Sequence, residues 1–341
     1  MDPTTLQTTW YALLGVVWGL YLVLGGTDLG VGMLVRRTDR AAALRAIGPT
    51  WATNDVWLVL AIAATLGAFP GWYAELLSGA YLPLVLLVGA VMVRHAAIEL
   101  LGHATPAAVP RWERALVATS LAIPFLWGLI WAGALDGSLA RGQDAGLGLL
   151  QPEGVLAGLA LAALCRAQGA AFVRLRVPSA RADLPLLPGS ALAAALLLLA
   201  AAALTLGAAP GVAVGLVGGL LALAAVGGLG LLVLGAAVAR DDWSLLGAAC
   251  AMAGAVGVVL AVLHHAPVAG AGPHAVLLAD AAAGDVTLTA MLVIAGLLLP
   301  PLLLALGYAY VRFLRAPDDA PARGVGGLVA RAIRGTLREL R

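Results

Sequence analysis

The sequence predicts an all-α, polytopic membrane protein, and composition, long apolar runs and arginine placement each support this fold class. Hydrophobic residues make up 62% of the 341 residues and charged residues only 11%, whereas a typical soluble domain carries about 25% charged residues. Mean hydropathy is +0.98. Nine apolar runs are long enough, or nearly so, to cross about 30 Å of hydrocarbon as helices. A soluble globular core is therefore excluded.

These runs define the expected membrane spans, and the second run is the shortest. They lie near residues 10–34, 51–69, 78–98, 114–135, 152–173, 191–209, 212–238, 243–263 and 286–314. Residues 1–315 are thus expected to form one transmembrane helical domain. Residues 316–341 are expected to form a basic tail on the cytoplasmic membrane surface. No basic segment precedes the first run, so we expect an uncleaved anchor there.

Arginine placement predicts the orientation in the membrane. All 20 basic residues are arginine, which excludes chemistry that depends on a lysine. Arginines follow the first, third, fifth, seventh and ninth runs, and only Arg141 lies in a loop after an even-numbered run. The positive-inside rule then puts the N-terminus outside and the C-terminus in the cytoplasm. This bias would collapse if 51–69 did not cross, so we count that run as a span.

The first run contains a carboxylate, Asp28, inside the segment GGTDLGVGML of residues 25–34. Arg36 follows eight residues later, so Asp28 lies roughly 12 Å from the charged boundary of the helix. An Asp near mid-membrane costs about 2.5–3.5 kcal/mol on insertion scales. Such a group is expected to meet a partner, a water-filled path or a protonation equilibrium. The alternative is a packing helix whose Asp is neutralised by a hydrogen bond.

Glycines in the same run predict close helix packing. Gly15 and Gly19 are four residues apart, as are Gly26 and Gly30, so each pair shares a helix face. Small residues at this spacing let a second helix approach closely.

The start of the second run combines polar and aromatic residues. Asn54 and Asp55 lie one turn into the expected helix, where an acid favours the positive helix end. Trp51 and Trp57 are expected to be interfacial rings. These residues are open to a second interpretation, a helix cap with an aromatic belt and no functional role.

Several polar residues lie near the ends of later runs. Arg94 and Glu99 are five residues apart, which makes an ion pair within one helix possible but not ideal. We expect His95 on the solvated rim. The adjacent His264 and His265 point about 100° apart and cannot share one metal ion. A haem ligand and a polar outer rim both remain open for this pair.

The rest of the chain offers little chemistry. The sixth and seventh runs are almost purely Ala, Leu, Val and Gly and are expected to form a lipid-facing or packing hairpin. Cys165 and Cys250 lie in apolar runs, and we expect no disulfide between them. The sequence contains no phosphate-loop, dinucleotide or zinc-binding motif. We therefore expect no metal site, no bound cofactor and no nucleic-acid partner for this chain alone.

Six ordered blocks of the sequence resemble subunit II of the cytochrome bd-type quinol oxidases. They are GTDLGVGML at 26–34, IGPTWATNDVWL at 47–58, FPGWY with SGAY within 69–81, LQPEGVLAG at 150–158, QGA at 168–170, and ADA with LTAM within 279–291. The resemblance runs nearly from end to end of the chain. It implies nine helices, arranged as two four-helix bundles plus a peripheral helix.

The same resemblance implies a role in aerobic respiration at the bacterial plasma (inner) membrane. The complex would oxidise quinol and reduce O2 to water. Haem b, haem d and the quinol site would belong to the partner, subunit I, in a heterodimer embedded in membrane lipid. Subunit II would carry no haem, would stabilise its partner, and could line a proton route from the cytoplasm.

Two departures from the family pattern bear on that route. Gly25 stands where the family usually has an acid, and Ala52 replaces an aspartate. The residues expected to form the surviving route are Asp28, Asn54 and Asp55, with Glu99 near its mouth. The alternative is that the route is lost and the subunit is only a scaffold. A second function class, a proton-coupled secondary transporter, also fits an intramembrane acid in a nine-span chain.

Overall fold

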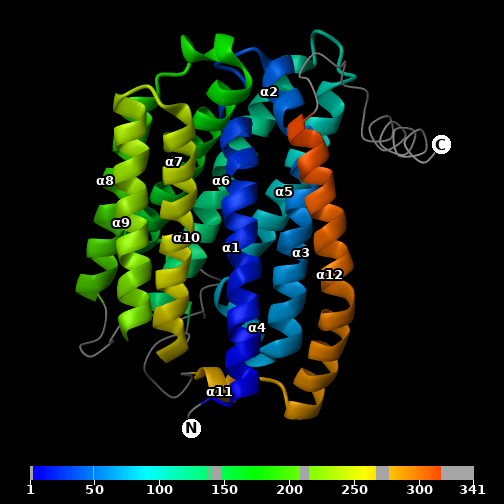
Figure 1. The fold of residues 1–341 in the computed structure, drawn as a ribbon, viewed down its shortest axis with the longest axis vertical. Helices are drawn as coiled ribbons and strands as arrows, with labels where there is room; N and C mark the ends of the chain where they lie inside the picture. Colours follow the sequence, from blue (N-terminus) through cyan, green and yellow to red (C-terminus); the bar gives the residue numbers. More distant parts are fainter. Residues whose placement is uncertain are drawn as a thin grey trace, which may run out of the picture.

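The computed structural model describes residues 3–48, 50–136, 138–139, 147–207, 215–265 and 276–315. These residues form an elongated assembly of helices that run side by side along its long axis (Figure 1). The prediction of an all-α fold is confirmed. Eight of the helices in the described residues are long and apolar enough to cross a membrane, and one further helix, α8, has a shorter apolar stretch at Leu186–Ala202.

Each expected span corresponds to one long helix. The long helices are α1 (Thr5–Leu34), α3 (Trp51–Ala68), α5 (Tyr81–Leu101), α6 (Val109–Asp136), α7 (Pro152–Arg176), α8 (Leu186–Gly207), α9 (Gly215–Ala237), α10 (Asp241–His265) and α12 (Asp285–Arg315). Shorter helices connect them: α2 (Arg40–Ile47), α4 (Pro70–Gly79), α11 (Leu278–Ala281), η2 (Leu147–Leu149) and η3 (Pro178–Arg181).

Local sequence signals explain where several helices begin. Thr4 accepts a hydrogen bond from the backbone of Gln7, whose side chain bonds back to Thr4, so a capping box starts α1. The Asp39 side chain accepts hydrogen bonds from two backbone amides in the first turn of α2. Pro152 occupies the first helical position of α7, as its sequence context predicts.

One segment differs from the sequence-based expectation. The segment from Phe69 to Tyr73 reads as a short outer turn with interfacial rings, but it begins the ten-residue helix α4. Trp72 is buried in the core at 5% exposure. The third span consequently starts at Tyr81 instead of residue 78, because α4 continues to Gly79.

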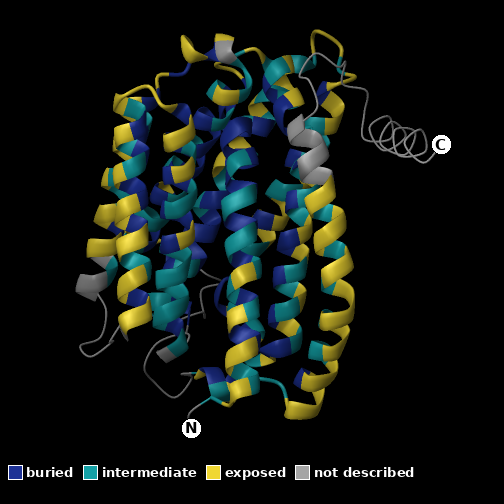
Figure 2. Cartoon of the chain, in the orientation of Figure 1, coloured by how far each residue is buried: buried dark blue, intermediate teal, exposed yellow. Residues whose placement is uncertain are grey.

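The long helices form two groups that share α1 as a central contact. In the first group, α1 packs against α3 and α6, and α5 packs against α6. In the second group, α7 packs against α8 and α10, and α9 packs against both α8 and α10. Contacts of α1 with α7 and α10, and of α6 with α7, join the groups. Helix α12 touches α1 and α3 at the edge, and it is exposed along most of its length (Figure 2). This arrangement agrees with two four-helix bundles plus a peripheral helix.

Helix α1 begins and helix α12 ends at opposite ends of the assembly (Figure 1). This placement is what an odd number of crossings requires. Several arginines form ion pairs at the end of the assembly where α1 and α7 finish. Arg40 pairs with Glu113 there, and Arg174 pairs with Asp241. We call this end the arginine-rich end. The tail predicted at 316–341 lies outside the described residues, and the division into a domain and a tail stays a prediction.

Candidate functional site

Asp28 is the buried carboxyl at the centre of the candidate site. It lies in α1, and the residue is 3% exposed. Asn54 Nδ2 donates a hydrogen bond to Asp28 Oδ2 at 2.5 Å, and Thr50 Oγ1 donates to Oδ1 at 3.5 Å. Asn54 Nδ2 also donates to the carbonyl of Leu24 at 3.3 Å. The start of α3 therefore supplies the partners that a buried carboxyl requires.

The next residue of α3, Asp55, meets a basic pair on α5. His95 Nε2 lies 2.5 Å from Asp55 Oδ2, and Arg94 Nη1 lies 3.8 Å from the same oxygen. The side chain of His95 is 36% exposed and that of Asp55 is 21% exposed, whereas that of Arg94 is only 3% exposed. The ring of Trp51 lies 5.1 Å from the His95 ring, centroid to centroid. The cluster thus runs from a half-exposed histidine to a buried arginine.

Arg94 connects the two carboxyls electrostatically. It forms an ion pair with Asp55 and also lies near enough to Asp28 for its charge to act on that carboxyl. Within the part of the chain that the structure describes, Arg94 Nε and Nη2 are buried without a hydrogen-bond partner. Buried unpaired donors are uncommon in folded proteins and call for an explanation, such as a functional role.

The ion pair considered between Arg94 and Glu99 does not form. Five residues turn a helix by about 140°, so the two side chains leave α5 on different sides. Arg94 points to Asp55 of α3, whereas Glu99 is exposed and its carboxylate makes no ion pair with any described residue. His95, expected on the solvated rim, has a partly exposed ring that bonds to Asp55. A basic residue inside an apolar run was the signal that could have singled out Arg94 as a partner for an intramembrane acid.

The glycines of α1 lie against α7 at the level of Asp28. A Cβ atom added at Gly30 would overlap the Cys165 backbone, and one at Gly169 would overlap the Gly30 backbone. At Gly26 an added Cβ would lie 3.3 Å from Cys165 Sγ and 3.4 Å from Gln168 Oε1. Gln168 Nε2 donates to the Val23 carbonyl and to Thr27 Oγ1, both at 2.7 Å. This close contact fixes the face of α1 that carries Asp28.

The other glycine pair of α1 behaves differently. A Cβ at Gly15 would lie 2.9 Å from Leu260 of α10, so this position packs closely. At Gly19 no heavy atom of the described residues lies within 4 Å of the added Cβ. The close packing expected at Gly19 is therefore absent. Helix α1 contacts α10 near Gly15 and α7 near Gly26, and Gly19 lies between these contacts.

The two tryptophans of α3 also have different environments. Trp51 is half-buried beside His95, whereas Trp57 is 4% exposed within the core. Six residues turn a helix by about 240°, so the two rings cannot share one face. The interfacial position expected for Trp57 is wrong for this chain. Its indole nitrogen is buried without a hydrogen-bond partner among the described residues.

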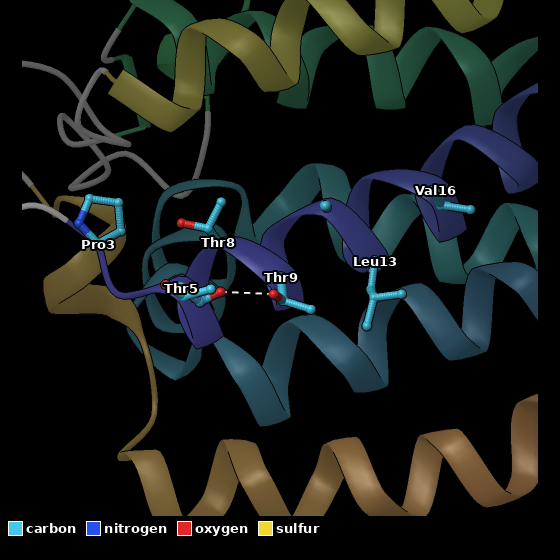
Figure 3. A pocket seen from close by; sticks show the side chains of 7 residues that line it. Pro3, Thr5, Thr8, Thr9, Leu13 and Val16 are labelled. Atoms are coloured by element: carbon cyan, nitrogen blue, oxygen red, sulfur yellow. Dashed lines mark hydrogen bonds between the residues drawn. The ribbon is translucent and has the colours of Figure 1, made fainter.

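Two other features lie away from the cluster. His264 packs edge-on against Tyr11, with ring centroids 5.3 Å apart. An open hollow of about 540 Å³ lies against the first turns of α1 (Figure 3), lined by Pro3, Thr5, Thr8, Thr9, Ala12, Leu13 and Val16. Val16 precedes Asp28 by twelve residues, or roughly 18 Å of helix. Within the described ranges, no group of three or more His, Cys, Asp or Glu residues could hold a metal ion.

Comparison with known proteins gives consistent matches. The family model for cytochrome bd terminal oxidase subunit II matches residues 6–313. The cytochrome bd ubiquinol oxidase subunit 2 of Bacillus subtilis (strain 168) is 32% identical over 187 residues, which cover 50% of this chain and 54% of that protein. The cytochrome bd-I ubiquinol oxidase subunit 2 of Escherichia coli (strain K12) is 28% identical over 193 residues, covering 52% and 50%.

The matched region spans about half the length of these curated relatives. A solved structure, the bd oxidase from Geobacillus thermodenitrificans, is similar with a TM-score of 0.71. The similarity covers 89% of this chain and 98% of that chain at 18% sequence identity. At this level of identity the structural similarity establishes the shared fold and nothing further.

Proposed function

The chain belongs to the cytochrome bd terminal oxidase subunit II family, and from this premise we propose that it serves a terminal quinol oxidase as its haem-free subunit. The complex would oxidise quinol and reduce O2 to water in the plasma (inner) membrane of a bacterium. Haem b and haem d would be held by the partner, subunit I. The long apolar helices support a multi-pass membrane protein.

The observation that carries this proposal is the partly exposed Asp55–His95 pair on the α3–α5 face. Charged side chains on a membrane-spanning helix are costly where they face lipid. On the same face, aliphatic side chains such as Val59, Val88 and Met92 are more than half exposed. A membrane-embedded protein partner could cover both the aliphatic surface and the polar pair. We therefore propose the α3–α5 face as the surface that receives subunit I.

We further propose that the polar cluster forms a proton route at the arginine-rich end. Asp55 and His95 are partly exposed, Asp28 is buried, and Arg94 acts on both carboxyls. The Asn54 and Thr50 side chains bond to Asp28 and would orient its carboxyl. Asp55 would take the place of the aspartate that Ala52 replaces in the family pattern. Glu99, exposed one turn beyond His95, would lie at the mouth.

The proposed orientation has the N-terminus outside and the C-terminus in the cytoplasm. It follows from the arginine distribution along the chain. A reporter domain fused after Arg240 should be cytoplasmic. An extracellular reporter at this position would contradict the orientation and the direction of the proton route.

The experiment that tests the function is purification of the tagged chain from native membranes, followed by an optical haem spectrum and a quinol oxidase assay. We expect a haem-bearing partner and O2 consumption driven by quinol. If the chain purifies alone as a stable species and drives substrate uptake in vesicles, the proton-coupled transporter replaces this proposal.

The route is tested by Asp28→Asn, which keeps the hydrogen-bonding shape but removes the proton-accepting carboxylate. We expect at least about tenfold lower turnover, equal to about 1.4 kcal/mol, with unchanged haem content. Asp280→Asn, at the opposite end of the assembly, is the matched control. Unchanged turnover in Asp28→Asn would leave the subunit as a scaffold.

A further inference from the structure

Two arginines at the arginine-rich end, Arg37 and Arg166, have no anionic partner among the residues that the structure describes. Arg166 lies in α7, ten residues before its end, and is half-buried. Arg37 follows α1 and is exposed. The two guanidinium groups lie near enough for their like charges to interact. Neither side chain makes a hydrogen bond or ion pair with any described residue.

Three acids of this end pair with other arginines. Asp241 binds Arg174 and Arg181. Glu113 binds Arg40 and lies 3.9 Å from Arg36, and Asp242 binds Arg240. These pairs compensate five arginines of this end but not Arg37 and Arg166, nor the exposed Arg45, Arg111 and Arg114. Among these uncompensated arginines, Arg166 is the one that is half-buried within a membrane-spanning helix. A half-buried charge inside a membrane-spanning helix is costly unless a partner compensates it.

The position of Arg166 indicates where such a partner would lie. A Cβ atom added at Gly189 would lie 3.2 Å from Arg166 Nη1, so the guanidinium touches the first turn of α8. The amide groups of a helix N-terminus add to the positive potential there. One turn deeper along α8, Leu192 is 55% exposed. The surroundings therefore offer positive charge at the helix end and an apolar surface below it.

We propose that Arg37, Arg166 and the first turn of α8 bind the phosphate of an anionic phospholipid headgroup. The acyl chains would lie along the exposed aliphatic side chains of α8. Basic pockets between helices on the cytoplasmic side of a membrane have the chemistry that binds such headgroups. This inference concerns lipid binding and stands independently of the oxidase activity.

The test compares lipid binding by the full-length protein purified from membranes and stripped of lipid. Phosphatidylglycerol, phosphatidylcholine and inorganic phosphate are added separately, and bound lipid is measured by native mass spectrometry alongside thermal unfolding. We expect phosphatidylglycerol to bind and to raise the unfolding temperature more than phosphatidylcholine does. Arg166→Gln should weaken phosphatidylglycerol binding about fivefold, as the loss of one arginine near the membrane surface implies.

Arg111→Gln is the control, because it removes the same charge from an exposed position at the same end of the molecule. Its lipid preference should match that of the unaltered protein. If Arg166→Gln does not fold, Arg37→Gln should weaken binding and Arg166→Lys should keep most of it. Equal protection by inorganic phosphate would indicate a free-anion site and overturn the proposal. An unaltered protein without lipid preference would also overturn it and would point to a carboxylate of the tail or a partner.

Discussion

The two helical bundles of this protein share an architecture but are held together by different means. In the first bundle, interlocking aromatic rings fill the core. Trp18 contacts Trp127 at 4.8 Å and Trp131 at 5.1 Å between ring centroids, and Trp127 donates a hydrogen bond to Tyr21. Buried polar groups such as Asp28 lie in the same bundle. Aromatic rings and buried polar groups therefore share the core of this bundle.

In the second bundle, helices α9 and α10 pack with their backbones in close contact at glycine positions. An added Cβ at Gly228 would overlap Ala251, one at Gly247 would overlap Leu232, and one at Gly254 would come within 2.5 Å of Ala225. Small residues at such positions let membrane helices approach closely. Its ion pairs among the described residues lie at one end, where Asp241 accepts hydrogen bonds from Arg174 and Arg181. Charge thus stabilises the end of the second bundle, whereas in the first bundle it lies inside and has a proposed function.

The largest effect is expected where the second bundle relies on charge. The side chain of Asp241 is 1% exposed and that of Arg174 is 11% exposed. Asp241→Ala would leave a largely buried arginine without its partner, so we expect a loss of about 3–5 kcal/mol in stability. Thermal and denaturant unfolding of the purified protein measure this change.

The neighbouring residue supplies the control. Asp242 is exposed and binds the exposed Arg240, so Asp242→Ala should leave stability nearly unchanged. Equal destabilisation by both variants would mean that total charge, and not the buried pair, holds this end together. Turnover per folded complex should stay normal in both variants.

The next effect tests backbone packing between α9 and α10. In Gly247→Ala the new methyl group would overlap the Leu232 backbone, so the helices must move apart. We expect a loss of about 1–3 kcal/mol in unfolding free energy, the usual cost of overpacking. Gly230→Ala is the control, because its added Cβ would have no heavy atom within 4 Å in the part of the chain that the structure describes. That variant should be neutral or slightly stabilised by the better helix propensity of alanine.

These contrasts also explain what the sequence could and could not predict. Hydropathy located the spans because a membrane helix needs a long apolar run. Asp28 stood out because a carboxyl interrupts such a run. Its partner Asn54 could be named from the sequence, but the hydrogen bond across 26 residues depends on how α1 and α3 pack.

Other contacts depended on features that sequence patterns leave open. The pairing of Arg94 with Asp55 spans two helices, and spacing within one helix pointed to Glu99 instead. Asp241 lies at the start of α10, where the helix dipole alone would explain an acidic residue. The sequence therefore gives no sign that two arginines from other segments pair with Asp241. Glycine spacing predicted which face of α1 packs closely. It could not predict that Gly19 lies between the contact of α1 with α10 and its contact with α7.

A smaller effect should distinguish the outer surfaces of the two bundles. Val59 of α3 and Leu223 of α9 are 68% and 69% exposed in this chain. If subunit I covers the α3–α5 face, Val59→Trp introduces a clash there, and the yield of intact complex should fall about fivefold, equal to about 1 kcal/mol. Leu223→Trp would meet only lipid and should leave the yield unchanged. Co-purification of the haem-bearing partner measures both, and the reverse result would move the interface to the second bundle.

The smallest effect concerns the entry to the polar cluster of the first bundle. His95→Gln keeps a hydrogen-bond donor near Asp55 but cannot take up a proton, so proton delivery should slow while folding is preserved. Delivery can continue through Asp55 itself, and we therefore expect only a two- to threefold loss in turnover, about 0.5 kcal/mol. Steady-state O2 consumption with saturating quinol measures it. Glu99→Gln removes an exposed acid with no ion-pair partner among the described residues, so its effect should be smaller still. A larger loss of turnover in Glu99→Gln than in His95→Gln would indicate that protons enter the route at Glu99, as the sequence predicts. His95 would then serve only to pack against Trp51.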